Sequence, residues 1–125
     1  MTSLVDTSVL IDVLRGNPTA RDLLLAERTC GPLLASEITR LEVLAGMRAA
    51  ERERTLRLLS ALAWQPVDTA VAEKAGELGR DWLPGHGGID SADLAIAATA
   101  VLQEATLLTR NVKHFPMFTG LRAPY

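Results

Sequence analysis

Residues 4–11 read Leu-Val-Asp-Thr-Ser-Val-Leu-Ile. An apolar pair is followed at Asp6 by three polar residues and then by a second apolar run. The two apolar residues before Asp6 suit a short buried strand, and the apolar spacing that begins at Val9 suits a helix. Thr7 or Ser8 is expected to cap that helix. The stretch therefore predicts a strand followed directly by a helix, with Asp6 at the carboxyl end of the strand.

The same alternation of short apolar segments and helical patterns continues along the chain. Further strands are expected at residues 31–35, 64–67 and 106–109, with a last edge strand at 121–125. Helices are expected between them, opened by Pro18 and by Ser36 or Thr39, with a long amphipathic helix over 48–62, one from Asp68 or Thr69 through 82, and an apolar one over 94–102. Strands that alternate with helices predict a single α/β domain, residues 1–125, with a mostly parallel sheet covered on both faces.

The composition limits the functions that this chain can serve. The 125 residues suit one domain, and the net charge of −2 differs from the basic balance of proteins that bind nucleic acid by charge alone. Binding to RNA would therefore need a local arginine patch, a partner or a metal ion. The single cysteine, Cys30, excludes an intrachain disulfide and a zinc site built from cysteines. The longest uncharged apolar stretch, residues 94–103, is too short to cross a bilayer, and Asp6 and Asp12 interrupt any signal-peptide pattern, so we expect a soluble cytoplasmic protein.

Asp6 stands where the first strand is expected to end. In open parallel α/β sheets the ligand crevice lies at the carboxyl ends of the strands, so the position itself indicates a site. A helix N-cap is an equally good interpretation, because aspartate caps helices well. The two roles are compatible, since one carboxylate has several lone pairs.

Asp93 opens a helix that is otherwise almost entirely apolar, reading Asp-Leu-Ala-Ile-Ala-Ala-Thr-Ala over residues 93–100. A helix that is apolar all round is buried, and an acid in its first turn is stabilised by the helix dipole. Asp93 is therefore expected near the strand ends. Asp90, one turn earlier, is interpreted as the N-cap of this helix, and the two residues form an acidic variant of the capping box.

Glu42 stands between two apolar residues in a short helix. Alone it would be interpreted as a solvated helix residue, or as part of a cap that involves Thr39. If Glu42 converges with Asp6 and Asp93, the three carboxylates cannot all ionise close together without a cation. Carboxylate oxygens suit Mg²⁺ or Mn²⁺, and a water held by such an ion can attack a phosphodiester. An acidic pocket of this kind predicts phosphoryl chemistry.

Four short motifs, in order across almost the whole chain, resemble the PIN domain of VapC-type toxins from bacterial toxin–antitoxin pairs. They are VDTSVLI at residues 5–11, TRLEVLAG at 39–46, DLAIAATA at 93–100 and LTRNVKHF at 108–115. The resemblance implies a three-layer α/β/α fold with a Rossmann-like sheet of four to five strands. It also implies a Mg²⁺- or Mn²⁺-dependent endoribonuclease that acts on tRNA or rRNA and leaves a 5′-phosphate and a 3′-hydroxyl. A homodimer and a small cognate antitoxin are the implied protein partners.

Carried over residue by residue, the resemblance makes Asp6, Glu42 and Asp93 the metal ligands and catalytic acids. Asp6 and Asp93 would hold the ion, and Glu42 would be a further ligand or a base. Many relatives have a fourth acid after the last strand, where this chain has Asn111. Asparagine can orient a water or supply one oxygen, but it adds no charge, so we expect one firmly held Mg²⁺ ion.

The resemblance also implies roles for the residues around these acids. Three hydroxyl side chains are expected to hold the carboxylates or a water, namely Thr7, Ser8 and Thr109. Asp90 would support the same site. Arg110 and Lys113 would contact RNA phosphate, although ordinary surface charge is the better interpretation for Lys113. Neither His86 nor His114 receives a role.

Two other functions fit parts of the pattern. A catalytically silent PIN-fold module that binds RNA or protein would share the fold, but the presence of all three acids disfavours it. A receiver-type signalling domain has similar length and layering. It would need an acidic pair after the first strand, whereas Asp6 is followed by Thr7, and a phospho-accepting Asp, whereas the second strand ends in Ala35 and Ser36. The apolar side of residues 48–62 is expected either to pack on the sheet or to bind a partner.

Overall fold

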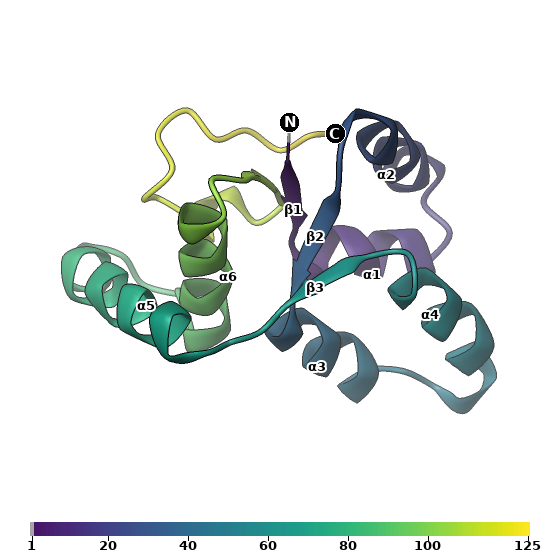
Figure 1. Ribbon diagram of the computed structural model, residues 1–125, viewed down its shortest axis with the longest axis horizontal. Helices are drawn as coiled ribbons and strands as arrows, with labels where there is room; N and C mark the ends of the chain where they lie inside the picture. Colours follow the sequence, from purple (N-terminus) through teal and green to yellow (C-terminus); the bar gives the residue numbers. More distant parts are fainter. Residues whose placement is uncertain (1) are drawn as a thin grey trace.

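The four strands found in the computed structural model, which describes residues 2–125, form one parallel sheet in the order β3-β2-β1-β4 (Figure 1). The strands are β1 (Ser3–Val5), β2 (Leu33–Ser36), β3 (Ala63–Gln65) and β4 (Thr106–Leu108). The helices are α1 (Thr7–Leu14), α2 (Pro18–Cys30), α3 (Glu37–Ala45), α4 (Arg52–Leu59), α5 (Thr69–Trp82) and α6 (Ser91–Leu102). Three short 3₁₀ turns complete the description: η1 (Ala49–Glu51), η2 (Leu83–Gly85) and η3 (Val112–His114).

The sheet has a switch point beside β1. From β1 the chain builds outward in one direction through β2 and β3, and it then returns to place β4 on the other side of β1. The backbone N–H of Asp6 donates to the Leu108 carbonyl at 2.9 Å, so the ends of β1 and β4 are bonded side by side. Ligand crevices of open α/β sheets form at such switch points. The predicted position of Asp6 at a strand end is therefore confirmed.

Side chains alternate between the two faces of the sheet, and helices cover both. Val5, Ala35 and Leu108 pack in the apolar cluster that includes residues of α1, α2 and α4. Leu4 and the neighbouring strand residues on its face pack instead against α6, which in turn contacts α5. Figure 1 shows α5 and α6 on one side of the sheet and α1, α2 and α4 on the other. The predicted three-layer α/β/α fold is confirmed.

The helix α6 lies buried against the sheet because its sequence leaves no polar face. All eight residues from Asp93 to Ala100 are buried. The alanines at positions 97 and 98 have no exposed surface, so the helix backbone comes close to the sheet and to α5. The apolar pattern therefore predicted this helix correctly, and the burial places the acid in its first turn at the edge of the sheet.

Two predicted elements were wrong. Residues 48–62 do not form one long helix: η1 precedes α4, because Glu51 caps the turn by accepting from the backbone N–H of Arg48 at 2.9 Å. Residues 121–125 contain no strand. Pro124 lacks an N–H for a ladder, and the Tyr125 hydroxyl bonds to Asp12 on α1, so this segment crosses toward α1. Within residues 2–125, no helix combines the length and the apolar character that a bilayer span needs.

Candidate active site

A cavity of about 440 Å³ opens at the carboxyl edge of the sheet and is strongly acidic. The carboxylates that line it are Asp6, Asp12, Glu42, Asp90 and Asp93. The basic residues that line it are Arg15 and Arg110, and the other lining residues are Thr7, Ser8, Ile11, Asn111 and His114. The structure thus brings the three predicted acids to one cavity, from the end of β1, from α3 and from the first turn of α6.

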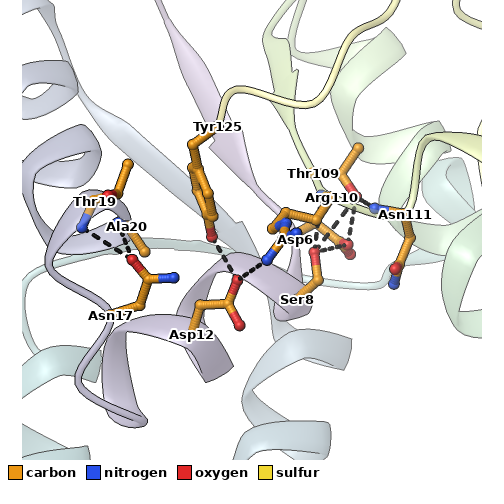
Figure 2. Close-up of polar contacts among 10 residues, drawn as sticks. All are labelled: Asp6, Ser8, Asp12, Asn17, Thr19, Ala20, Thr109, Arg110, Asn111 and Tyr125. Carbon is orange, nitrogen blue, oxygen red and sulfur yellow. Dashed lines mark hydrogen bonds and ion pairs between the residues drawn. The ribbon is translucent and has the colours of Figure 1, made fainter.

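Asp6 occupies the N-cap position of α1, but its side chain makes no capping hydrogen bond. Its Oδ2 instead accepts from Ser8 Oγ at 2.8 Å and from Thr109 Oγ1 at 2.7 Å (Figure 2). The side chain is only 3% exposed. The prediction that Thr7 or Ser8 caps α1 was wrong, because the cap position is one residue earlier and both hydroxyls bond to carboxylates.

Thr109 ties the segment after β4 to this carboxylate. The side chain is fully buried, and its Oγ1 also accepts from the backbone N–H of Asn111 at 2.9 Å. The backbone N–H of Arg110 donates to Ser8 Oγ at 3.2 Å. Two hydroxyls therefore fix both Asp6 and the backbone of residues 109–111, and this brings Asn111 into the cavity lining.

Glu42 reaches the cavity because α3 starts directly after β2, at the carboxyl edge of the sheet. Thr7 Oγ1 donates to Glu42 Oε1 at 2.7 Å and lies 3.0 Å from the buried Thr39 Oγ1. Ser36 caps α3, through a bond from the Ile38 N–H to Ser36 Oγ. Glu42 is therefore not part of a cap with Thr39, and its half-buried carboxylate is oriented by Thr7.

The predicted capping box of α6 is confirmed. Asp93 N–H donates to Asp90 Oδ1 at 2.8 Å, and Asp90 N–H donates to Asp93 Oδ2 at 3.1 Å. Burial of Asp93, which is 9% exposed, raises the pKa of its carboxyl from 3.8 to about 6, and the charges of Asp90 and Asp6 also raise it. The Asp90 backbone hydrogen bond and His114, whose Nδ1 lies 3.2 Å from Asp93 Oδ2, act in the opposite direction.

The three acids share one feature that bears on ligand binding. Hydrogen bonds and the His114 contact hold one oxygen of each, namely Asp6 Oδ2, Glu42 Oε1 and Asp93 Oδ2. Among residues 2–125, no side chain or backbone group donates to the other oxygen of any of them. Each carboxylate is therefore oriented through one oxygen and has the second available for a cation or a water.

The donor set fits a hard divalent cation at an open site. Mg²⁺ is usually held by one or two carboxylates and keeps several waters, so it does not require a closed protein cage. In the described part of the chain, no three Asp, Glu, His or Cys side chains come close enough to enclose an ion by themselves. A cation that shares its coordination between water and the available carboxylate oxygens fits both observations.

Three other residues considered in the sequence lie outside the cavity lining. Lys113 is exposed and lies outside the cavity lining, and Thr109 lies behind Asp6 and does not line the cavity. His86 bonds to the Trp82 carbonyl through Nδ1 at 3.0 Å and is not part of the lining either. Asp12 also lines the cavity, although its sequence position predicted no role for it. It is an acid inside the apolar run of α1, which is the same kind of signal that identified Asp93.

Known proteins similar to this chain agree with the fold. The PIN domain family model matches residues 3–116. Ribonuclease VapC19 of Mycobacterium tuberculosis is 44% identical over 123 residues, which cover 98% of this chain and 98% of the relative. Ribonuclease VapC10 of the same organism is 44% identical over 122 residues, which cover 98% and 92%.

Solved structures extend the similarity to three dimensions. A toxin–antitoxin complex from Klebsiella pneumoniae contains a chain that matches with a TM-score of 0.82 and 30% identity, over 98% of both chains. The family model covers nearly the whole chain, and the two relatives match it over 98% of its length. This chain belongs to the PIN domain family.

Proposed function

We propose that this protein is a metal-dependent endoribonuclease and the toxin of a toxin–antitoxin pair. The observation that carries the proposal is the acidic cavity, in which Asp6, Glu42 and Asp93 each have one oriented and one available oxygen. The names of the two Mycobacterium tuberculosis relatives, both ribonucleases and both 44% identical to this chain, support RNA as the substrate.

Asp6 and Asp93 hold the cation in this proposal, and Glu42 is a further ligand or accepts the proton of the attacking water. A bound Mg²⁺ or Mn²⁺ ion would lower the pKa of a water and neutralise charge on the phosphodiester. Thr7 keeps Glu42 oriented, and Ser8 and Thr109 keep Asp6 oriented.

The remaining polar side chains of the cavity act on the water and the substrate. Asn111 orients the water through its amide, and Asp90 holds the backbone from which Asp93 projects. Arg110 binds a phosphate of the RNA, since its guanidinium reaches the same cavity. The products carry a 5′-phosphate and a 3′-hydroxyl, and the substrates are tRNA or rRNA in the cytoplasm.

The protein partners belong to the same proposal. The Klebsiella pneumoniae structure is a toxin–antitoxin complex and is 30% identical to this chain, which supports a small cognate antitoxin as the inhibitor. We also propose that the protein forms a homodimer. Size measurement of the protein alone and of its complex with the product of an adjacent small gene tests both partners.

The direct test compares Asp6→Asn and Asp93→Asn with wild type in an RNA cleavage assay that contains Mg²⁺. Asp81→Asn is the matched control, because Asp81 is an exposed α5 residue outside the cavity lining. We expect both cavity variants to lose at least a hundredfold in rate and the control to cleave normally. Full activity of either cavity variant would overturn the proposal, and RNA that is bound but never cut by wild type would support the silent binding module.

A further inference from the structure

Asp12 joins two residues that are far from it in the sequence. Its Oδ2 lies 3.2 Å from Arg110 Nη1 and accepts from the Tyr125 hydroxyl at 2.7 Å. The Arg110 Cζ also lies 5.1 Å from the centroid of the Tyr125 ring, within the range of a cation–π interaction. Figure 2 shows the Arg110 side chain extending from the region of Asp6 and Ser8 toward Asp12 and Tyr125. A carboxylate and an aromatic ring thus both contact the guanidinium and hold it in place.

In this position the Arg110 guanidinium can still donate hydrogen bonds to a ligand. The side chain is 48% exposed and lines the acidic cavity, and its backbone N–H is fixed by Ser8. Only Nη1 contacts Asp12, and no residue within 2–125 accepts a hydrogen bond from Nε or Nη2. A guanidinium presents five N–H donors in a planar fork that suits phosphate oxygens. The donors left over can therefore bind a phosphate while the Asp12 contact persists.

The acidic cavity makes the restraint necessary. Four other carboxylates line it, those of Asp6, Glu42, Asp90 and Asp93. An unrestrained guanidinium would be attracted to these carboxylates and would occupy the oxygens that a metal ion needs. Asp12 and Tyr125 supply a competing partner for Arg110 at one part of the cavity.

We propose that Asp12 and Tyr125 are positioning residues that hold the Arg110 guanidinium ready for an RNA phosphate and away from the catalytic carboxylates. The inference rests on the proposed function and adds to it the part of the cavity where a substrate phosphate binds. Neither residue touches the reacting atoms: both act through Arg110.

The sign of the Asp12→Asn effect separates this proposal from simple electrostatics. Removal of one negative charge from an acidic cavity strengthens the binding of a polyanion if charge alone matters. Positioning predicts the opposite, a three- to tenfold weaker affinity, because the loss of the ion pair frees the guanidinium to move. The measurement is the fluorescence anisotropy of a labelled tRNA, with Ca²⁺ replacing Mg²⁺ so that cleavage does not interfere.

A double-mutant cycle tests whether Asp12 acts through Arg110. Asp12→Asn should weaken tRNA binding in the wild-type background. In an Arg110→Ala background only the change in charge remains, so the same substitution should leave binding unchanged or slightly tighter. A purely structural role of Asp12 in α1 would weaken binding in both backgrounds. Glu53→Gln is the control, since it removes an exposed ion pair with Arg57 at 3.0 Å on α4, outside the cavity, and should leave the affinity unchanged.

Substitutions of Tyr125 provide a second test of how Arg110 is positioned if the Asp12 variant folds poorly. Tyr125→Phe removes only the hydroxyl bond and should weaken binding less than Tyr125→Leu, which also removes the aromatic face. Unchanged or tighter binding by Asp12→Asn and Tyr125→Leu would overturn the inference.

Failure of the proposed function gives a different result. If wild type binds tRNA but never cleaves it with Mg²⁺, the ribonuclease proposal fails while the cycle still reports on Arg110. If wild type binds neither labelled tRNA nor labelled rRNA, both proposals fail.

Discussion

Thr109 donates a hydrogen bond of 2.7 Å to Asp6, a residue 103 positions earlier in the chain. The bond joins the end of β4 to the end of β1, at the switch point of the sheet. The same threonine oxygen accepts from the Asn111 backbone. One buried hydroxyl therefore orients a carboxylate of the cavity and fixes the loop beside it.

Replacement of this hydroxyl by a methyl group should damage activity more than the fold. Thr109→Val keeps the shape but leaves Asp6 with one hydroxyl partner and the Asn111 N–H with none. We expect a loss of about 1–3 kcal/mol in unfolding free energy and a ten- to hundredfold lower cleavage rate. Urea unfolding and single-turnover cleavage measure the two effects. Thr109→Ser restores the hydroxyl and should recover most of the activity, and a fully active Val variant would contradict the role.

Thr7 provides a parallel test at Glu42. Thr7→Ala removes the donor to Glu42 Oε1, so the carboxylate should rotate more freely and the cleavage rate should fall about tenfold. Thr7→Ser retains the donor and should behave like wild type. Equal rates for the alanine and serine variants would show that the contact does not contribute.

The raised pKa of Asp93 predicts how stability depends on pH in the metal-free protein. The folded state holds a proton on Asp93 up to about pH 6, whereas an ordinary aspartate releases it near 3.8. The folded state therefore binds more protons in this window, and stability must fall as the pH rises from about 4 to above 6. The contribution is about 3 kcal/mol at most.

Asp93→Asn isolates this contribution, because asparagine can keep the hydrogen bond from the Asp90 N–H but does not ionise. Relative to wild type, the variant should gain up to about 3 kcal/mol of stability between pH 4 and pH 7. Denaturant unfolding of both proteins across this range measures it. A pH-independent difference between them would contradict the cause given for the shift.

The presence of asparagine at position 111 predicts that one metal ion binds tightly. Asn111 lines the cavity where an acid would add a negative charge. Wild type should bind one Mn²⁺ ion firmly, and Asn111→Asp should bind Mn²⁺ several-fold more tightly or take up a second ion. Titration followed by electron paramagnetic resonance counts free Mn²⁺ directly. Two equally tight ions in wild type would contradict the one-ion expectation.

The parts of the fold that follow from local pattern were predictable. The apolar run after Asp93 and the strand before Asp6 identify buried elements, and the Asp90–Asp93 box follows from residue spacing. The break between η1 and α4 depends on one side-chain cap. The helical spacing of apolar residues continues across the break, so it predicted one unbroken helix.

The long-range contacts of the cavity were beyond local pattern. The resemblance identified Thr7 and Thr109 as supporting hydroxyls, but their particular partners depend on how β1, α3 and β4 meet. The contact of Asp12 with Tyr125 spans 113 positions, and the same sequence segment was expected to form a strand. Tertiary contacts of single side chains leave no periodic signal in the sequence.

The metal-dependent ribonuclease site is tested most directly by the rate of RNA cleavage as a function of Mg²⁺ concentration, measured on protein first stripped with EDTA. A site built on these carboxylates should show no cleavage without metal, a saturable rise as Mg²⁺ is added, and no rise with Asp6→Asn at the same concentrations. Undiminished cleavage by the stripped wild-type protein, or equal Mg²⁺ activation of Asp6→Asn, would contradict the claim that these carboxylates form a metal-dependent ribonuclease site.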